Sequence, residues 1–228
     1  MTEVKAGLQG VVIAQTSICS IDGERGQLLY RGYDIHDLAA HSTFEEVIYL
    51  LWYGRLPNRH ELDALQKELT GQRAVAPEVL DLLKKLPRAQ HPMETLRTMV
   101  SALALFDAEA ETMTEEANRR KAARLTAQIG TLVAAMARTR AGKEPVAPDP
   151  KLGHAANFLY MLQGKPPDTA DARDFDVALI LHADHSFNAS TFAARVTAST
   201  LSDLQVSLLG SVYAGLGVCK WPVVARNN

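Results

Sequence analysis

One pattern repeats along the chain from about residue 36 onward and constrains its fold more than any other feature. Apolar residues recur at helical spacing, and each such stretch ends at a glycine, a proline or a capping residue. Within residues 44–51 the apolar positions fall at i, i+3, i+4 and i+7, which places on one helix face Phe44, Val47, Ile48 and Leu51. About nine or ten segments of this kind follow one another. The sequence therefore predicts an all-α, multi-helical fold.

Capping residues and prolines indicate where several of these helices begin. Ser42 stands three residues before Glu45, which is the spacing of a capping box. Asn58 precedes a second amphipathic segment, and Pro92 lies in the first turn of another, where its missing N–H costs little. The longest pattern spans roughly residues 115–140. On it we expect four basic side chains to face water: Arg119, Arg120, Lys121 and Arg124.

The first 35 residues have a different pattern. β-Branched residues occur in segments 11–13 and 18–21, an Asp22-Gly23 pair follows, and a second apolar run spans residues 28–30. This order predicts a hairpin or two short strands, which are marginally stable alone. We therefore expect strands in residues 1–35 that pack on a helical domain comprising residues 36–228.

Composition excludes several classes of partner. Basic and acidic residues nearly balance at 24 and 26, so no charged surface for nucleic acid or anionic membrane is expected. The two cysteines, Cys19 and Cys219, lie at opposite ends of the chain and suggest no disulfide framework. The N-terminus lacks the apolar run that is typical of a signal peptide. We expect a cytoplasmic protein.

Three titratable residues follow an apolar stretch in the motif ILHADH. His182 and His185 are three residues apart, so on a helix they share a face. Asn188 comes soon after and favours the start of another helix. A helix end followed at once by a helix start suits a small anion, because the N-terminus of a helix attracts negative charge.

The residues alone leave three interpretations of this cluster open. The first is a carboxylate-binding corner in which His185 is a donor. The second is a metal site, and a metal-dependent hydrolase, built from His182, Asp184 and His185. The third is structural, with two buried histidines satisfied by backbone carbonyls. Among the other histidines we expect a surface location for His36, His41 and His60, and a structural role for His154.

Five ordered motifs carry a family resemblance: IDGERGQLLYRGYDIHDLA, FEEVIYLLWYGRLPNRHEL, HPMETLRT, HAANFLYML and DVALILHADHSFNASTF. In that order they resemble the N-terminal part of bacterial citrate synthases, from about residue 7 to residue 203. The resemblance implies an all-α large domain with short N-terminal strands. It also implies a homodimer formed through packed helices, and no metal ion or prosthetic group.

The resemblance further implies an acyltransferase that condenses oxaloacetate with acetyl-CoA to citrate and CoA in the tricarboxylic acid cycle. Close relatives use propionyl-CoA and make 2-methylcitrate. Matching the family's HxDH motif assigns oxaloacetate binding to His185, with Asn188 in the same pocket and His182 as a supporting residue. The resemblance thus favours the carboxylate interpretation over the metal interpretation.

The sequence departs from the family pattern after TLSD. A segment resembling LKGPLHGGAN is typical there, whereas this chain reads CKWPVVARNN, with Val224 where the family has a catalytic histidine. No residue of this chain is therefore assigned a catalytic role. We expect the large domain to be truncated, the small domain to be absent and the 228-residue chain to be inactive. A non-catalytic helical dimerisation module remains the alternative.

Overall fold

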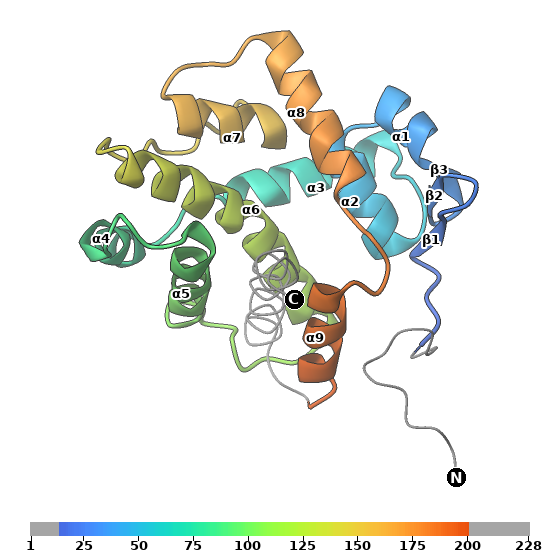
Figure 1. Ribbon diagram of the computed structural model, residues 1–228, viewed down its shortest axis with the longest axis horizontal. Coiled ribbons are helices and arrows are strands. Elements are labelled where there is room, and N and C mark those ends of the chain that lie inside the picture. Colours follow the sequence, from blue (N-terminus) through green and yellow to red (C-terminus); the bar gives the residue numbers. More distant parts are fainter. Residues whose placement is uncertain (1–13, 201–228) are drawn as a thin grey trace, which may run out of the picture.

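The computed structural model describes residues 14–200, and within that range a small sheet precedes nine helices (Figure 1). The strands are β1 (Cys19–Asp22), β2 (Gln27–Tyr30) and β3 (Tyr33–Asp34). The helices are α1 (Ile35–His41), α2 (Phe44–Tyr53), α3 (Arg59–Gly71), α4 (Pro77–Lys85), α5 (Pro92–Ala104), α6 (Glu115–Arg140), α7 (His154–Gln163), α8 (Thr169–Leu181) and α9 (Ala189–Ala198). The predicted all-α class with short N-terminal strands is confirmed.

Helix α6 is the central element of the described structure. Its 26 residues span about 39 Å at the usual rise per residue, and it contacts α3, α4, α5 and α7 (Figure 1). One buried apolar cluster joins α4 and α5 to α6. A second joins α2 and α3 to α6. A third lies under the sheet and includes α1, α2 and Ile180 of α8. These clusters form the core.

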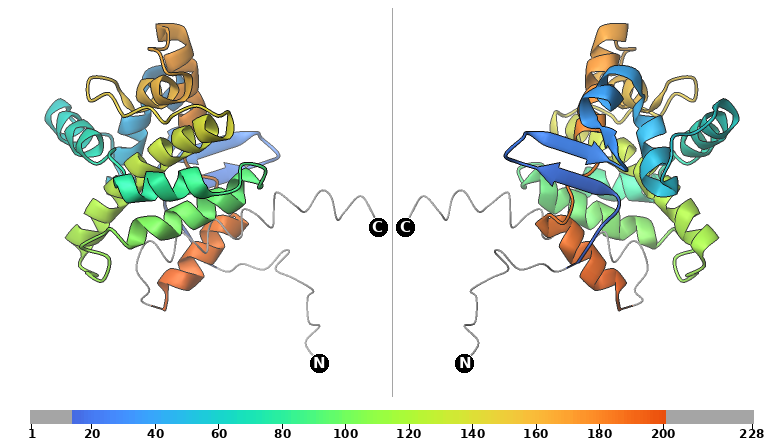
Figure 2. Two further views of the ribbon diagram at one scale, coloured as in Figure 1. Left: turned by 90° about the vertical axis from the view of Figure 1, so that its left-hand side faces the viewer. Right: turned by 90° about the vertical axis from the view of Figure 1, so that its right-hand side faces the viewer.

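The sheet lies at one side of the molecule next to α1 (Figure 2). Strands β1 and β2 pair antiparallel in the predicted place, but the turn is longer than Asp22-Gly23, because Asp22 pairs with Gln27 across a four-residue loop. The Asp22 carboxylate accepts from two amides of that loop, and Gly26 takes the positive φ it requires. The third strand, β3, was not predicted. Residues 11–13 lie outside the described range.

Two of the predicted helix starts are confirmed and one is wrong. Asn58 caps α3 in a capping box, and Pro92 is the first residue of α5. The cap of α2 is Thr43 with Glu46 as its partner, not Ser42 with Glu45. Ser42 instead ends α1, where its amide donates to the Leu38 carbonyl.

The prediction that Lys121 faces water is also wrong. Its side chain is fully buried, and Nζ donates to the carbonyls of Ala110 (3.1 Å) and Thr112 (2.8 Å) in the loop before α6. Arg124 is largely covered as well and pairs with the Asp107 carboxylate at 2.5 Å. Long basic side chains cover apolar surface with their stems, so a basic run on a helix does not by itself identify a solvent-facing side.

Buried polar contacts tie α8 to α2, and α2 to α7. Asp176 of α8 accepts from the Phe44 amide at the start of α2 through Oδ1 (3.1 Å). Arg173, one turn earlier, donates to the Ser42 carbonyl at 2.8 Å. Glu45 of α2 accepts from the first amide of α7, that of His154, through Oε1 (2.9 Å). These contacts supply partners that the helix termini lack, and they hold α7 and α8 against the start of α2.

No helix between residues 14 and 200 is both long enough and apolar enough to cross a membrane. Cys219 and Val224 lie outside the described residues. The division into strands at 1–35 and a helical domain at 36–228 stays a prediction.

Candidate functional site

The three titratable residues of the HADH motif lie in the loop between α8 and α9. The prediction that one helix carries both imidazoles is wrong, because α8 ends at Leu181 and His182 is its C-cap. Beyond the helix, Asp184 Oδ2 accepts from the Ser186 amide at 3.0 Å. Ser186 has a φ of 56°, a left-handed conformation that redirects the chain toward α9.

Asn188 starts the next helix, as predicted. Its Oδ1 accepts from the Thr191 amide at 2.9 Å, which makes it the N-cap of α9. The side-chain NH₂ of Asn188 makes no hydrogen bond to the described residues, and the residue is exposed. The loop therefore ends at a helix N-terminus, where negative charge is favoured.

The two imidazoles differ in their contacts. His182 Nδ1 lies 2.7 Å from the Ala178 carbonyl, so it donates to the last turn of α8. His185 is exposed, and its ring makes no hydrogen bond to any residue in the described part of the chain. The interpretation that both histidines are buried and structural is therefore wrong, since both are exposed.

The metal interpretation finds no support in this geometry. Between residues 14 and 200, no three His, Cys, Asp or Glu side chains converge as metal ligands would. His182 and Asp184 direct their polar atoms to backbone groups of their own segment instead.

The loop rests on the N-terminal sheet, which sequence reasoning did not associate with it. The fully buried Tyr30 of β2 places its hydroxyl 3.0 Å from the Asp184 carbonyl and 3.2 Å from the Asp184 amide. Its cross-strand neighbour Cys19 is buried near the Asp184 carboxylate. Burial, and then this carboxylate, raises the pKa of the Cys19 thiol to about 11. Burial also raises the pKa of Tyr30, so both groups are neutral donors at pH 7.

The remaining histidines lie away from this loop. The predicted surface positions of His36, His41 and His60 are confirmed. His91 caps α5, since its Nδ1 accepts from the Met93 amide at 3.3 Å. A role for these side chains in a shared site has no geometric basis within the described residues.

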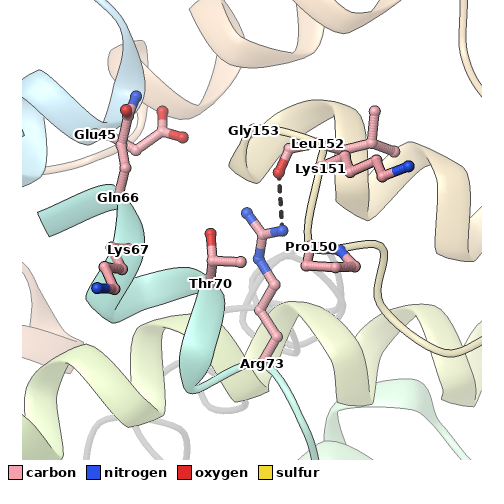
Figure 3. Close-up of a pocket in the computed structure, with 9 residues that line it drawn as sticks. All are labelled: Glu45, Gln66, Lys67, Thr70, Arg73, Pro150, Lys151, Leu152 and Gly153. Carbon is pink, nitrogen blue, oxygen red and sulfur yellow. Dashed lines mark hydrogen bonds between the residues drawn. The ribbon is translucent and has the colours of Figure 1, made fainter. Parts of the chain in front are cut away.

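A separate pocket of about 410 Å³ lies between the end of α3 and the segment before α7 (Figure 3). It is lined by Glu45, Gln66, Lys67, Thr70, Arg73, Pro150, Lys151, Leu152 and Gly153. None of the residues that the sequence assigned to a site lines this pocket.

Arg73 holds the two sides of this pocket together. Its buried guanidinium donates through Nη1 to the carbonyls of Asp149 (3.0 Å) and Leu152 (2.8 Å), as Figure 3 shows for Leu152. Burial lowers its pKa, while Glu45 and Asp149 oppose that shift. Because its bonded nitrogen is directed at main-chain carbonyls, the arrangement fastens residues 149–152 to the segment that follows α3.

His154 lies beside this pocket, and its structural role stays a prediction. Its ring lies against Phe44 with centroids 5.3 Å apart, and Nδ1 is buried without a hydrogen-bond partner. Burial, and then the charge of Arg73, lowers the pKa of His154 to about 4. The imidazole is therefore neutral in the folded protein at neutral pH.

Comparisons with known proteins agree with this architecture. The family model described as citrate synthase, C-terminal domain, matches residues 7–219. A citrate synthase of Haloferax volcanii is 50% identical over 214 residues, covering 92% of this chain and 56% of that protein. A 2-methylcitrate synthase of Mycobacterium tuberculosis is 43% identical, covering 93% of this chain and 53% of its own length.

A solved structure also matches. It is a citrate synthase of the thermophilic archaeon Thermoplasma acidophilum in a ternary complex with carboxymethyl coenzyme A and oxaloacetate. Its TM-score is 0.86 at 27% identity, and the match covers 92% of this chain and 56% of that one. The chain thus spans about half the length of the relatives it matches.

The low pKa of His154 predicts a loss of stability as the pH falls. Between pH 6.5 and 4 the unfolded chain binds a proton at this residue that the folded chain does not, so the free energy of unfolding decreases toward acid. Relative to pH 7, the loss at pH 5 is roughly 2 kcal/mol. His154→Phe removes the titrating group while keeping a buried ring, and we expect it to flatten this part of the pH dependence.

Urea unfolding of the two proteins at pH 7 and pH 5 measures this difference. His60→Phe, which replaces an exposed imidazole of α3, is the matched control and is expected to keep the wild-type pH dependence. Equal losses in wild type and His154→Phe would contradict the prediction.

Proposed function

This chain belongs to the citrate synthase family, and from that premise we propose that it carries the oxaloacetate-binding corner of an enzyme that condenses oxaloacetate with acetyl-CoA. The loop between α8 and α9 is the proposed corner. The observation that carries the proposal is the exposed His185 imidazole, which has no hydrogen-bond partner in the described structure and stands three residues before the N-cap of α9.

The chemistry of oxaloacetate suits this corner. The ligand carries two carboxylates and a ketone oxygen, all of which are hydrogen-bond acceptors. An imidazole N–H of His185 and the NH₂ of Asn188 are donors, and the N-terminus of α9 adds a favourable field for negative charge. A donor at the ketone oxygen also polarises that carbonyl toward attack by a carbon nucleophile. In this proposal His185 and Asn188 bind oxaloacetate.

His182 has a supporting role in the proposal. Its Nδ1 donates to the Ala178 carbonyl, which closes the last turn of α8 and fixes the start of the loop. The His182 ring is thereby committed to a backbone contact, whereas the ring of His185 has no hydrogen-bond partner among residues 14–200. This difference supports the assignment of binding to the second histidine of the motif.

The proposed partners are oxaloacetate and an acyl-CoA, with no metal ion or prosthetic group. The Thermoplasma acidophilum relative, solved with oxaloacetate and a coenzyme A analogue, supports both. Acetyl-CoA is the preferred acyl donor, because a citrate synthase relative reaches 50% identity. Propionyl-CoA is the alternative, supported by the 43% identity to a 2-methylcitrate synthase. The proposed compartment is the cytoplasm.

We further propose that the chain forms a homodimer. Large apolar side chains are exposed where α5 leads into α6, with Leu105 83% and Phe106 51% exposed. Exposed apolar surface of this kind is typical of association sites. The same surface would serve the alternative function, a non-catalytic dimerisation module. The exposed His185, whose ring has no hydrogen-bond partner in the described part of the chain, favours the ligand-binding function over that alternative.

Oxaloacetate binding at this loop predicts a thermal shift. A ligand that binds only the folded state stabilises it, so a hundredfold excess over Kd raises Tm by roughly 5–10 °C. Differential scanning fluorimetry of the wild-type chain measures the shift. His185→Ala is expected to abolish it, because the proposed donor is lost. His60→Ala, the exposed control on α3, is expected to keep it. A full shift in His185→Ala contradicts the assignment.

The 228-residue chain is also proposed to make no citrate by itself. Val224 stands where the resemblance places a catalytic histidine, and it offers no group to donate or accept a proton. We expect a coupled thiol assay of CoA release with oxaloacetate and acetyl-CoA to show no more turnover than the His185→Ala variant. Citrate formation above that control would overturn this part of the proposal.

A further inference from the structure

We propose that Tyr30 is a positioning residue for the oxaloacetate corner: its hydroxyl fixes the peptide between Asp184 and His185 and thereby sets where the His185 imidazole points. This inference rests on the proposed function of the loop. It assigns to the N-terminal sheet a part in ligand binding, although no strand residue is assigned to contact the ligand.

The Tyr30 hydroxyl contacts several main-chain groups at once. Tyr30 Oη donates to the Asp184 carbonyl at 3.0 Å, accepts from the Asp184 amide at 3.2 Å and lies 3.4 Å from the Leu181 carbonyl. Leu181 is the last residue of α8, so the hydroxyl bridges the helix end and the loop. Both main-chain polar groups of Asp184 therefore depend on one side chain that is 154 residues away in sequence.

The residues on either side of His185 are both held in place. The Asp184 carbonyl and the His185 nitrogen belong to the same peptide group. The orientation of that carbonyl therefore fixes the peptide plane that precedes His185. On the other side, the Asp184 carboxylate holds the Ser186 amide in the left-handed turn. Cys19, opposite Tyr30 in the sheet, is buried near that same carboxylate.

The His185 imidazole has no hydrogen bond of its own among the described residues. Within residues 14–200, its position therefore depends on the backbone that carries it. Tyr30 is fully buried among Ile35, Leu38, Val47 and Ile180, and the apolar contacts fix its ring. A rigid core residue thus holds the peptide that leads into His185, which is how a supporting residue maintains binding geometry.

The test compares Tyr30→Phe with the matched variant Tyr49→Phe in the 228-residue chain. Tyr49 is also a buried tyrosine, and its hydroxyl accepts from Arg55 at 3.3 Å, away from the loop. The first measurement needs no ligand: the ¹H–¹⁵N chemical shifts of the His185 imidazole and backbone. We expect Tyr30→Phe to shift them and Tyr49→Phe to leave them at their wild-type values.

The second measurement is oxaloacetate affinity by isothermal titration calorimetry. We expect Tyr30→Phe to weaken binding about tenfold, the usual scale for loss of one buried hydrogen bond, and Tyr49→Phe to leave it unchanged. If wild type does not bind oxaloacetate, the proposed function fails, while the chemical shifts still test the positioning. Unchanged His185 signals in Tyr30→Phe, or equal changes in both variants, would overturn the inference.

Hydrogen exchange in the wild-type chain tests the contact even if Tyr30→Phe does not fold. The Asp184 amide lies outside any helix and yet is expected to exchange slowly, because it donates to a buried hydroxyl. Exchange as fast as that of the exposed His185 amide would contradict the proposed role of Tyr30.

Discussion

Four buried charged side chains that hydrogen-bond main-chain groups are the constraint on which the rest of the described structure depends. Glu45 and Asp176 accept from the first amides of α7 and α2, whereas Arg73 and Lys121 donate to carbonyls of loops. A buried charge that loses its partner costs about 3–5 kcal/mol. Each of these contacts therefore fixes the position of one element relative to another. Asp176 holds α8, the helix that leads into the HADH loop, against the start of α2.

Much of the helical fold could be predicted from periodicity and capping, because those signals are local. Asn58 and Pro92 mark helix starts, and the extent of α6 matches the apolar pattern. Errors arose where long-range contacts decide between similar local options. Ser42 and Thr43 are both good caps, but Ser42 closes α1. Lys121 is basic, but two carbonyls that the pattern does not reveal draw it inward.

In the candidate site, too, local signals could be predicted from the sequence and long-range contacts could not. The HADH motif and the cap at Asn188 identified the loop from the sequence, and the family resemblance distinguished His185 from His182. The end of α8 at Leu181 was not predicted, because the apolar pattern continues up to the motif. Tyr30 gave no functional signal, since a tyrosine in a short apolar strand is most simply a core residue. Its role follows only from a contact that spans 154 residues of sequence.

The most direct test of the account is to map where oxaloacetate binds. A ¹H–¹⁵N correlation spectrum of the 228-residue chain, titrated with oxaloacetate, reports every affected amide. The account predicts changes concentrated in residues 182–191 and at Tyr30, with no change around the basic pocket of Lys67, Arg73 and Lys151. Changes centred on that pocket, with the α8–α9 loop unaffected, would contradict it.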